Sequence, residues 1–415
     1  YGMIVGEVQE GAFKHFIMCG AEKGTVARIA SGDISLDEPF GDFVGGLDIP
    51  GCHEWPVRMP RPYRKKFAPV TPLVTGQRIV DFLFPLARGG AAIIPGGFGT
   101  GKTIFEQSVA KFADVDIVVY VGCGERGNEM ADLIAEFDEL EDPWTKRRLR
   151  DRTILVVNTS NMPVAAREAS IYTAVTMAEY YRDMGYNVLF LADSLSRWAE
   201  ALREISTSLE EMPGEEGYPT YLASRLSAFI ERAGVVETMN GRIGSLSMIL
   251  SVSPPGGDFT EPVTQACLRT TGAFFMLDTS LAHRRHFPAI NWFQSYSLYA
   301  RELSEHYCRE VAPEWEELRR RCNQLLQQEE SIREVAEIVG IEGLQDADRL
   351  VMRVAERIRN EFLGQNAYSD DAFSPPVKTL ALIKSIVECH DRAAEKLNQG
   401  VSLDEALKET VVSSQ

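Results

Sequence analysis

A glycine-rich loop with a single lysine constrains the fold of this chain more than any other feature. Residues 96–103 read Gly-Gly-Phe-Gly-Thr-Gly-Lys-Thr, a complete Walker A pattern, G-x-x-x-x-G-K-[ST]. Glycines remove Cβ atoms, so that consecutive backbone N–H groups can close around phosphate oxygens. Lys102 would bring positive charge to the β- and γ-phosphates, and the Thr103 hydroxyl would ligate Mg²⁺. The motif predicts a nucleoside triphosphate site formed by Gly96, Gly97, Phe98, Gly99, Thr100, Gly101, Lys102 and Thr103.

The sequence on either side of the loop agrees with this interpretation. Residues 91–95 are a short apolar run that favours a strand, and residues 103–110 are compatible with a helix. The loop would then lead into a helix N-terminus, which attracts anions. A glycine-rich turn that matches by chance is the alternative, and the flanking strand and helix argue against it.

Composition and charge exclude several classes of protein. The 415 residues exceed one ordinary domain, and 45% hydrophobic with 25% charged residues is typical of a globular chain. The sequence has neither an apolar run of membrane-spanning length nor a secretory leader. With 43 basic and 60 acidic residues the net charge is −17, which opposes broad nucleic-acid binding. The seven scattered cysteines form no C-x-x-C pair, so we expect free thiols in a reducing compartment.

The N-terminal part of the chain favours strands. Residues 1–68 are rich in Gly and Pro and contain short alternating runs such as 24–29. The basic stretch 58–66 reads as a linker with solvated charges, which we prefer to a nucleic-acid patch. Because the chain starts at Tyr1 and opens directly on strand-like sequence, we expect a fragment that lacks an earlier segment.

Two further regions follow. From about 69 to 300, strand and helix signals alternate, which predicts a parallel sheet covered by helices. The expected strands are 117–121, 154–157, 188–192 and 246–250, and 164–182 is an expected helix. Beyond 300 only helical periodicity remains: Leu350, Val354, Ile358 and Phe362 recur at i+4. The helical pattern continues over 379–397 and 403–407. We expect an α/β fold with domains 1–68, 69–300 and 301–415.

Two strand ends carry carboxylates suited to phosphoryl transfer. Asp193 follows the strand 188–192 as a Walker B element and would hold Mg²⁺ directly or through water. The alternative is that Asp193 only caps the next helix. Glu125 follows the strand that ends at Val121, which we expect to neighbour the strand before the Walker A loop. There it would polarise the attacking water. Glu129, expected on the first turn of the next helix, is the less favoured alternative.

Two arginines lie beside these carboxylates in the sequence. Arg126 would add positive charge next to Glu125 or fix its loop. Arg197, four residues after Asp193, would reach a phosphate group or the phosphate product. The alternative for Arg197 is an exposed helix arginine paired with Glu200.

In these motifs and the stretches around them, the chain resembles the catalytic A subunits of vacuolar/archaeal-type (V/A-type) rotary ATPases. The resemblance spans nearly all of 69–370, with a weaker echo in 1–68. Catalytic subunits of F-type and export ATPases share the mechanism, but the stretches around Gly122 and Pro254 favour the V/A type. The matching stretches are 96–103, 118–130, 158–172, 193–206, 209–226, 251–265 and 284–292.

The resemblance implies a RecA-like P-loop core, preceded by a partial β-rich "bulge" domain and followed by an α-helical domain. It implies that Glu125 is the catalytic carboxylate, with Arg126 its neighbour in the site, and that Arg197 is a phosphate ligand. It also implies an adenine pocket, although plain core packing remains an alternative for the aromatic side chains. The pocket would be walled by Phe287, Gln365, Tyr368 and Phe373.

The resemblance further implies ATP hydrolysis or synthesis coupled to H⁺ or Na⁺ transport. A non-catalytic B subunit would insert an arginine in trans, and the central and peripheral stalk subunits would be further partners. Residues 341–348 would form the lever that pushes the central stalk, or else an acidic interhelical turn. We expect a cytoplasmic chain that is peripheral to a membrane and reaches it only through the holoenzyme.

Two departures from the family stand out. Gly97 stands where the family commonly has Pro or Ala. Thr100 stands where the family commonly has Ser or Cys, and it removes any thiol switch there. The family's N-terminal β-barrel is missing, so we do not expect this chain to form a stable ring by itself. The rivals are a hexameric nucleic-acid translocase, which the negative charge opposes, and a non-catalytic nucleotide-binding scaffold. Retention of Lys102, Glu125 and Asp193 opposes the scaffold.

Overall fold

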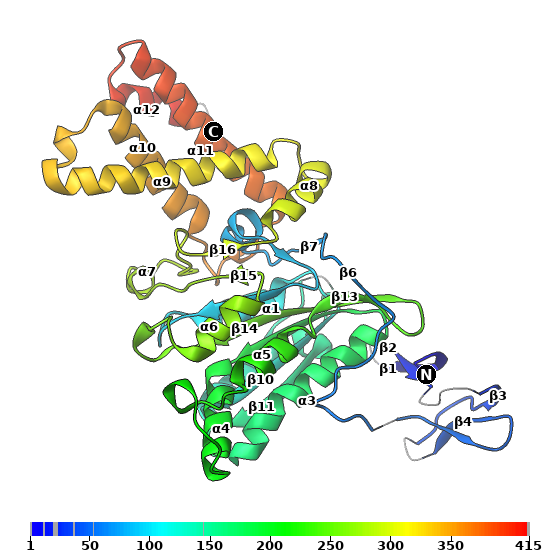
Figure 1. Cartoon of the computed structure of the whole chain (residues 1–415). Coiled ribbons are helices and arrows are strands. Elements are labelled where there is room, and N and C mark those ends of the chain that lie inside the picture. Colours follow the sequence, from blue (N-terminus) through cyan, green and yellow to red (C-terminus); the bar gives the residue numbers. More distant parts are fainter. Residues whose placement is uncertain are drawn as a thin grey trace. The chain divides into compact units, whose positions relative to one another are not determined.

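The computed structural model describes residues 2–10, 13–19, 24–35, 38–52, 54–143 and 145–412. The chain forms two compact units, each assembled from separate stretches (Figure 1). The first unit comprises Tyr1–Pro69, Arg88–Ile93 and Val115–Thr271. The second unit comprises Val70–Ala87, Ile94–Asp114 and Gly272–Gln415.

The first unit is a mixed α/β body. Its strands are β1 (Ile4–Glu10), β2 (Phe13–Met18), β3 (Val26–Ile29), β4 (Pro39–Phe43), β5 (Asp48–Pro50), β6 (Lys65–Phe67), β10 (Ile117–Glu125), β11 (Thr153–Thr159), β12 (Asn187–Asp193), β13 (Gly234–Glu237) and β14 (Ile243–Val252). Its helices are α2 (Gly127–Glu139), α3 (Val164–Asp183), α4 (Leu195–Ser208), α5 (Leu222–Ile230) and α6 (Pro262–Thr270), with short turns η2 (Leu149–Arg152), η3 (Glu215–Gly217) and η4 (Pro255–Gly257).

The central sheet confirms the parallel strands expected from sequence. Its order is β11-β10-β12-β14, all parallel, and β9 (Ala91–Pro95) follows β14. The strands consist of β-branched and apolar residues because α3 and α4 pack against them. The expectation that the Glu125 strand neighbours the Walker A strand was wrong: β12 and β14 stand between β10 and β9.

The N-terminal strands form small sheets, as the Gly- and Pro-rich sequence predicted. β1 and β2 make an antiparallel pair, and β3, β4 and β5 make a second sheet. Phe16 and Met18 of β2 pack with Met184, just after α3. The Tyr186 hydroxyl donates a hydrogen bond to the Lys14 carbonyl, 2.9 Å away. These contacts attach the hairpin to the body of the first unit.

The basic stretch 58–66 differs from the solvated linker expected from its sequence. Arg61 is buried, and its Nε lies 2.7 Å from an Asp183 carboxylate oxygen. Its guanidinium also stacks over the rings of Trp55 and Tyr180. Arg61 therefore ties the segment to α3 and buries a charge that a linker would leave in water. The other basic side chains of the stretch are exposed, as expected: Arg58, Arg64, Lys65 and Lys66.

The second unit carries the Walker A loop and the C-terminal helices. Its elements are β7 (Pro72–Leu73), η1 (Ile79–Leu83), β8 (Leu86–Ala87), α1 (Lys102–Phe112), β15 (Ala273–Phe274), α7 (Thr279–His283), β16 (Tyr296–Ser297), α8 (Ala300–Glu310), α9 (Trp315–Val339), η5 (Ile341–Gly343), α10 (Asp346–Arg357), η6 (Ile358–Leu363), η7 (Asp370–Ala372), α11 (Pro376–Asn398) and α12 (Leu403–Val412). β9 continues into this unit from Ile94 onward and lies beside β15, which in turn pairs with β16.

The C-terminal helices confirm the predicted apolar stripe. Leu350, Val354, Ile358 and Phe362 are all buried, where α10 packs against α9 and α11. The stripe crosses from α10 into η6, a helical segment with the wider π-type turn. Among the described residues, we find no helix that combines the length and the apolar character required to cross a bilayer.

Candidate functional site

The Walker A loop lies between β9 and α1 in the second unit. Gly99 and Gly101 have φ values of 75° and 85°, in the left-handed region that favours glycine. α1 starts at Lys102, so the N–H groups of its first turn point toward the loop without intrahelical acceptors. The loop therefore presents backbone donors and the positive end of a helix to an anion.

Side chains within the loop hold it closed. Lys102 Nζ donates to the carbonyl oxygens of Gly96 and Gly97, at 2.6 and 2.9 Å. The Thr100 hydroxyl donates to the Gly97 carbonyl, 2.9 Å away. A Cβ on Gly96 would lie 2.7 Å from Thr100 Oγ1 and 2.8 Å from Leu277 Cβ, which is too close. The loop thus needs glycine at its first position for packing, and the positively charged lysine sits at its centre.

A large cavity lies in the same unit, next to the loop. Its volume is about 1070 Å³, enough for a nucleotide base and ribose. Leu277 pairs with Gly96 in a parallel bridge, and Asp278 and Ser280, the next residues along, line the cavity. Ile104 of α1 lines it as well. The 277–280 segment therefore runs from the Walker A loop to the cavity.

The predicted adenine residues occupy different positions relative to this cavity. Phe287, Gln365 and Tyr368 line it, and Tyr368 is 82% exposed. Phe373 lies outside the lining and stacks on Phe112 of α1, with ring centroids 5.5 Å apart. The Gln365 amide is buried and is bonded to protein groups on both its oxygen and its nitrogen.

Charged groups of both signs border the cavity. Burial would raise the pKa of Asp278, but hydrogen bonds from Ser280 and Asn291 outweigh it and hold that pKa below its usual value. Arg333 and Arg359 both pair with the buried Glu329 carboxylate, with closest N–O distances of 2.5 and 2.6 Å. The cavity wall is therefore held by ion pairs from α9 and η6.

In the first unit, the two predicted carboxylates stand at neighbouring strand ends. Gly122 of β10 pairs with Asp193 of β12, and Glu125 ends β10 three residues later. Asp193 is buried, and the Tyr120 hydroxyl lies 3.5 Å from its Oδ2. Burial raises the pKa of the intervening Cys123 thiol to about 12, so this sulfur stays protonated. The sheet therefore brings Glu125 and Asp193 to one edge, where open α/β sheets bind ligands.

The two predicted arginines also lie at this edge. Arg126 is exposed and lies 3.7 Å from Glu129, which occupies the first turn of α2 as expected. Arg197 of α4 lies 2.9 Å from Glu200, the pairing weighed as an alternative. That hydrogen bond raises the pKa of Arg197, and the Glu125 charge adds to the rise. Arg197 is thus electrostatically coupled to Glu125 and is half exposed.

Each unit supplies an oxygen group of the kind that Mg²⁺ prefers. Thr103 of the second unit carries a hydroxyl, and Asp193 of the first unit carries a carboxylate. Within the described part of the chain, no cluster of three or more His, Cys, Asp or Glu side chains could hold a metal alone. Mg²⁺ in nucleotide enzymes typically takes one or two protein oxygens and completes its shell with phosphates and water.

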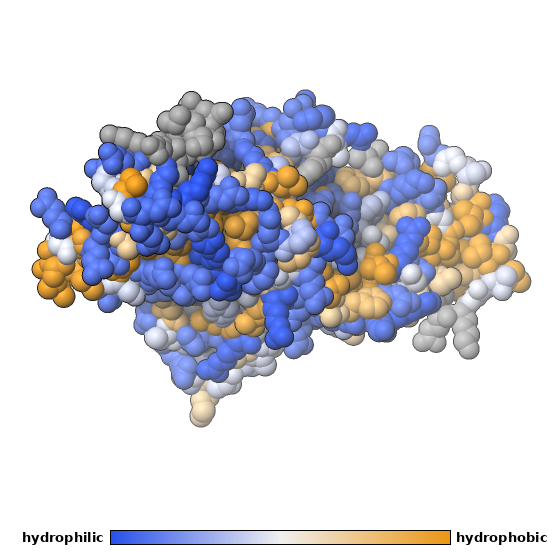
Figure 2. Space-filling view, turned by 90° about the horizontal axis from the view of Figure 1, so that it is seen from above, coloured by the Kyte–Doolittle hydropathy of each residue, from blue (hydrophilic) through white to orange (hydrophobic). Residues whose placement is uncertain are grey.

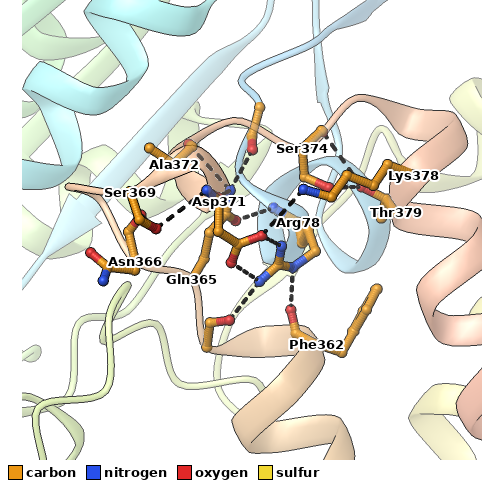
Figure 3. Close-up of polar contacts among 12 residues, drawn as sticks. Arg78, Phe362, Gln365, Asn366, Ser369, Asp371, Ala372, Ser374, Lys378 and Thr379 are labelled. Carbon is orange, nitrogen blue, oxygen red and sulfur yellow. Dashed lines mark hydrogen bonds and ion pairs between the residues drawn. The ribbon is translucent and has the colours of Figure 1, made fainter. Parts of the chain in front are cut away.

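Sequence reasoning missed one residue beside the cavity. Arg78 is buried and bonds to Asp371 and Gln365 of the cavity lining (Figure 3). Nearly 300 residues separate Arg78 from these partners, and no motif marks it. The one available signal was an arginine directly before a mostly apolar stretch, residues 79–83, in which Asp81 is the single charged residue.

Comparison with known families gives two matches that together cover most of the chain. Residues 76–297 match the ATP synthase alpha/beta family, nucleotide-binding domain. Residues 304–407 match the C-terminal domain of V and A type ATP synthase.

Curated relatives agree with these matches. The A subunit numbered 1 of the A-type ATP synthase of Methanospirillum hungatei is 53% identical over 403 residues, covering 96% of this chain and 69% of that protein. The A subunit of the A-type ATP synthase of Methanosarcina acetivorans is 52% identical over 410 residues, covering 98% and 71%.

Solved structures share the fold. The assembled ATPase EscN of the enteropathogenic E. coli type III secretion system has a TM-score of 0.67 at 27% identity, covering 78% of this chain and 73% of that one. The ATP synthase subunit NeqB of Nanoarcheaum equitans has a TM-score of 0.70 at 23% identity, covering 83% and 82%, and supports the fold alone.

Proposed function

The chain belongs to the family of A-type ATP synthase A subunits, the catalytic subunits of V/A-type ATPases, and from this we propose how its residues act. We propose that it binds Mg·ATP and hydrolyses or synthesises ATP at an interface with a non-catalytic B subunit. A central stalk would couple this reaction to H⁺ or Na⁺ transport.

The observation that carries the proposal is the continuity of the Walker A loop and the cavity. Both lie in the second unit, and the 277–280 segment connects them. A triphosphate on the loop and a base in the cavity would then belong to one molecule. Phe287 and Tyr368 supply aromatic faces on which a base can stack.

The loop residues would hold the phosphates. Backbone N–H groups of 97–103 would donate to the phosphate oxygens, and Lys102 would exchange a carbonyl contact for the β- and γ-phosphates. Thr103 and Asp193 would hold Mg²⁺, which neutralises charge that develops on the phosphates.

Glu125 would orient the attacking water and take its proton as the γ-phosphoryl group leaves. Its place at the end of β10, beside the Asp193 strand, supports this role. Arg197 would leave Glu200 to bind the transferred phosphate, and Arg126 would fix the Glu125 loop. An arginine supplied in trans by the B subunit would contribute about 10³–10⁵ in rate.

The turn between α9 and α10 supports contact with a central stalk. Ile338, Val339 and Ile341 are exposed there, and Figure 2 shows apolar atoms in orange at the left edge over this turn. Exposed apolar groups of this kind mark protein–protein contacts. We propose that the turn docks on the stalk, while peripheral stalk subunits hold the head.

The remaining proposals concern organisation and place. We keep the division into 1–68, 69–300 and 301–415 as a proposal, supported by the separate family matches of 76–297 and 304–407. We place the chain in the cytoplasm, where it would meet a membrane only through the assembled enzyme.

A matched pair of variants tests the catalytic assignment. We expect Glu125→Gln to keep Mg·ATP affinity and to lower turnover by about 10²–10⁴-fold, because the amide cannot accept the water proton. Affinity is measured by calorimetry, and turnover as phosphate release by the complex with the B subunit.

Glu129→Gln is the control, since Glu129 is a nearby carboxylate on the first turn of α2 whose ion pair with Arg126 is long, at 3.7 Å. Full activity of Glu125→Gln with loss in Glu129→Gln would move the role to Glu129. Failure of the wild-type complex to bind or hydrolyse ATP would overturn the proposed function as a whole. The chain alone should bind Mg·ATP but turn it over slowly.

A further inference from the structure

A short loop between η6 and α11 contributes much of the cavity wall. We call residues 364–371 the base loop, because Gly364, Gln365, Asn366, Ala367, Tyr368 and Asp371 all line the cavity. We propose that Arg78 is a positioning residue that clasps both ends of the base loop and so fixes the base-binding wall. The inference rests on the proposed function and deepens it.

Arg78 bonds to both ends of the loop at once (Figure 3). Its Nε donates to the Phe362 carbonyl at 2.7 Å, and Nη2 to the Gly364 carbonyl at 2.6 Å. The same guanidinium grips the Asp371 carboxylate through two bonds of 2.5 and 2.7 Å. A planar five-donor group suits this fork, and a lysine could not reproduce it.

The entry end of the loop needs such a donor. η6 ends at Leu363, so its last carbonyl groups lack intrahelical partners. The Arg78 cation satisfies two carbonyls there and interacts favourably with the negative end of the helix. Because the Arg78 side chain is only 1% exposed, these carbonyls would lose their partner without being rehydrated.

The exit end is held by charge. Burial would raise the pKa of Asp371, but its hydrogen bonds and ion pair with Arg78, aided by Lys378, keep it below the usual value. Asp371 therefore stays ionised at neutral pH, and its carboxylate remains a permanent partner for Arg78.

The polar groups of the Gln365 side chain bond to protein groups instead of being left open to the cavity, and these bonds add to the contacts that Arg78 makes with the base loop. Its Oε1 accepts from the Arg78 backbone N–H at 2.9 Å, and its Nε2 donates to the carbonyls of Gly76 and Asp371, both at 2.8 Å. Its own N–H donates to the Phe287 carbonyl at 2.7 Å. Gln365 thus sets the spacing between the base loop and the Phe287 aromatic wall.

The same turn touches the helix that follows the Walker A loop. Gln77, next to Arg78, donates to the Ser108 hydroxyl of α1 at 3.0 Å and to the Ala372 carbonyl at 3.2 Å. Phe373 stacks on Phe112 of the same helix. These contacts fix the position of the base loop relative to α1. The groups that contact the base and the groups that contact the phosphates therefore stay at a constant distance from each other.

Between its two clasped ends the base loop is held weakly. Tyr368 is exposed, and the middle of the loop makes local hydrogen bonds, such as Asn366 Oδ1 accepting from the Tyr368 N–H at 2.9 Å. Release of either end would let the loop sample other positions. Affinity for a base would then fall by the fraction of time that the loop is misplaced.

Two variants of the full chain test the clasp. Asp371→Asn removes the charge that Arg78 grips, and Asp391→Asn is the matched control. Asp391 makes the same two-bonded pair with Arg321, and its side chain is 42% exposed against 36% for Asp371. Arg78→Lys, which keeps the charge but not the fork, serves as a second test variant.

Calorimetry would measure Mg·ATP and Mg·tripolyphosphate binding for each protein, with thermal unfolding as a check on folding. For Asp371→Asn and Arg78→Lys we expect Kd for ATP to rise about 5- to 30-fold, with tripolyphosphate affinity nearly unchanged. Asp391→Asn should leave both affinities unchanged.

The outcomes separate the clasp from the proposed function. Wild-type ATP affinity in both test variants would overturn the clasp, and so would an equal loss for ATP and tripolyphosphate. A wild-type chain that binds neither ligand would instead overturn the proposed function.

Discussion

The pH dependence of stability should contain a specific contribution from Asp81. This carboxylate is fully buried in η1, where it accepts hydrogen bonds from the Thr75 N–H, the Thr75 hydroxyl and the Gly76 N–H at 2.8–2.9 Å. Burial raises its pKa from 3.8 to about 7, even though these hydrogen bonds lower it. The folded protein therefore takes up a proton here at a pH where the unfolded chain does not.

The sign follows from this difference. The stabilisation is complete below the unfolded pKa of 3.8 and is lost as the pH rises toward about 7. Each pKa unit is worth about 1.36 kcal/mol, so the change from about pH 7.5 to about pH 5 amounts to about 2.5 kcal/mol. Tyr307 of α8 is the neighbouring titratable group, and burial, with the Asp81 charge, keeps its pKa far above this range.

Urea unfolding of wild type and Asp81→Asn at both pH values measures this contribution. Other titrating groups are common to the two proteins and cancel in the difference. When the pH falls, the free energy of unfolding of wild type should rise by about 2.5 kcal/mol relative to that of Asp81→Asn. Between wild type and Asp404→Asn, a substitution at an exposed position, no such difference should develop. Parallel pH profiles for wild type and Asp81→Asn, or a gain of opposite sign, would refute the reasoning.

Two further predictions concern stability. In Gly76→Ala a Cβ would lie 2.3 Å from Phe373 Cδ2 at a φ of 78°, so we expect the melting temperature to fall with a loss of about 1–3 kcal/mol; an unchanged thermal unfolding curve would contradict this. In Arg61→Ala the buried Asp183 would keep only its pairing with Arg182, and we expect a loss of about 3 kcal/mol in urea unfolding. Wild-type stability of that variant would mean that the buried Arg61–Asp183 pair adds no net stability.

Local sequence patterns predicted most of the elements but not the long-range contacts. The Walker A strand and helix, the buried strands of the sheet and the apolar stripe of α10 follow from periodicity within about 20 residues. The order of strands in the sheet does not, because it depends on crossover connections. That is why β10 was expected beside β9.

The candidate site divides in the same way. The Walker A loop could be predicted because few functions other than phosphate binding need several glycines and a lysine together. The roles of Glu125, Arg197 and the adenine residues stay predictions. Arg78 could not be found, because its partners are nearly 300 residues away in sequence. Arg61 was misjudged because a basic, proline-containing stretch gives no hint that an acidic helix face will cover it.

One continuous helical rod joins two distant parts of the second unit. α10 begins at Asp346, just after η5 with its exposed apolar turn, and passes without a break into η6, whose end Arg78 holds. The rod is about 25 Å long at close to 1.5 Å per residue. A helix of this length behaves as a stiff strut, so a small tilt at the base-loop end becomes a larger sweep at the other. Under the function proposed above, closing on a nucleotide would thus move the turn that we propose docks on the stalk.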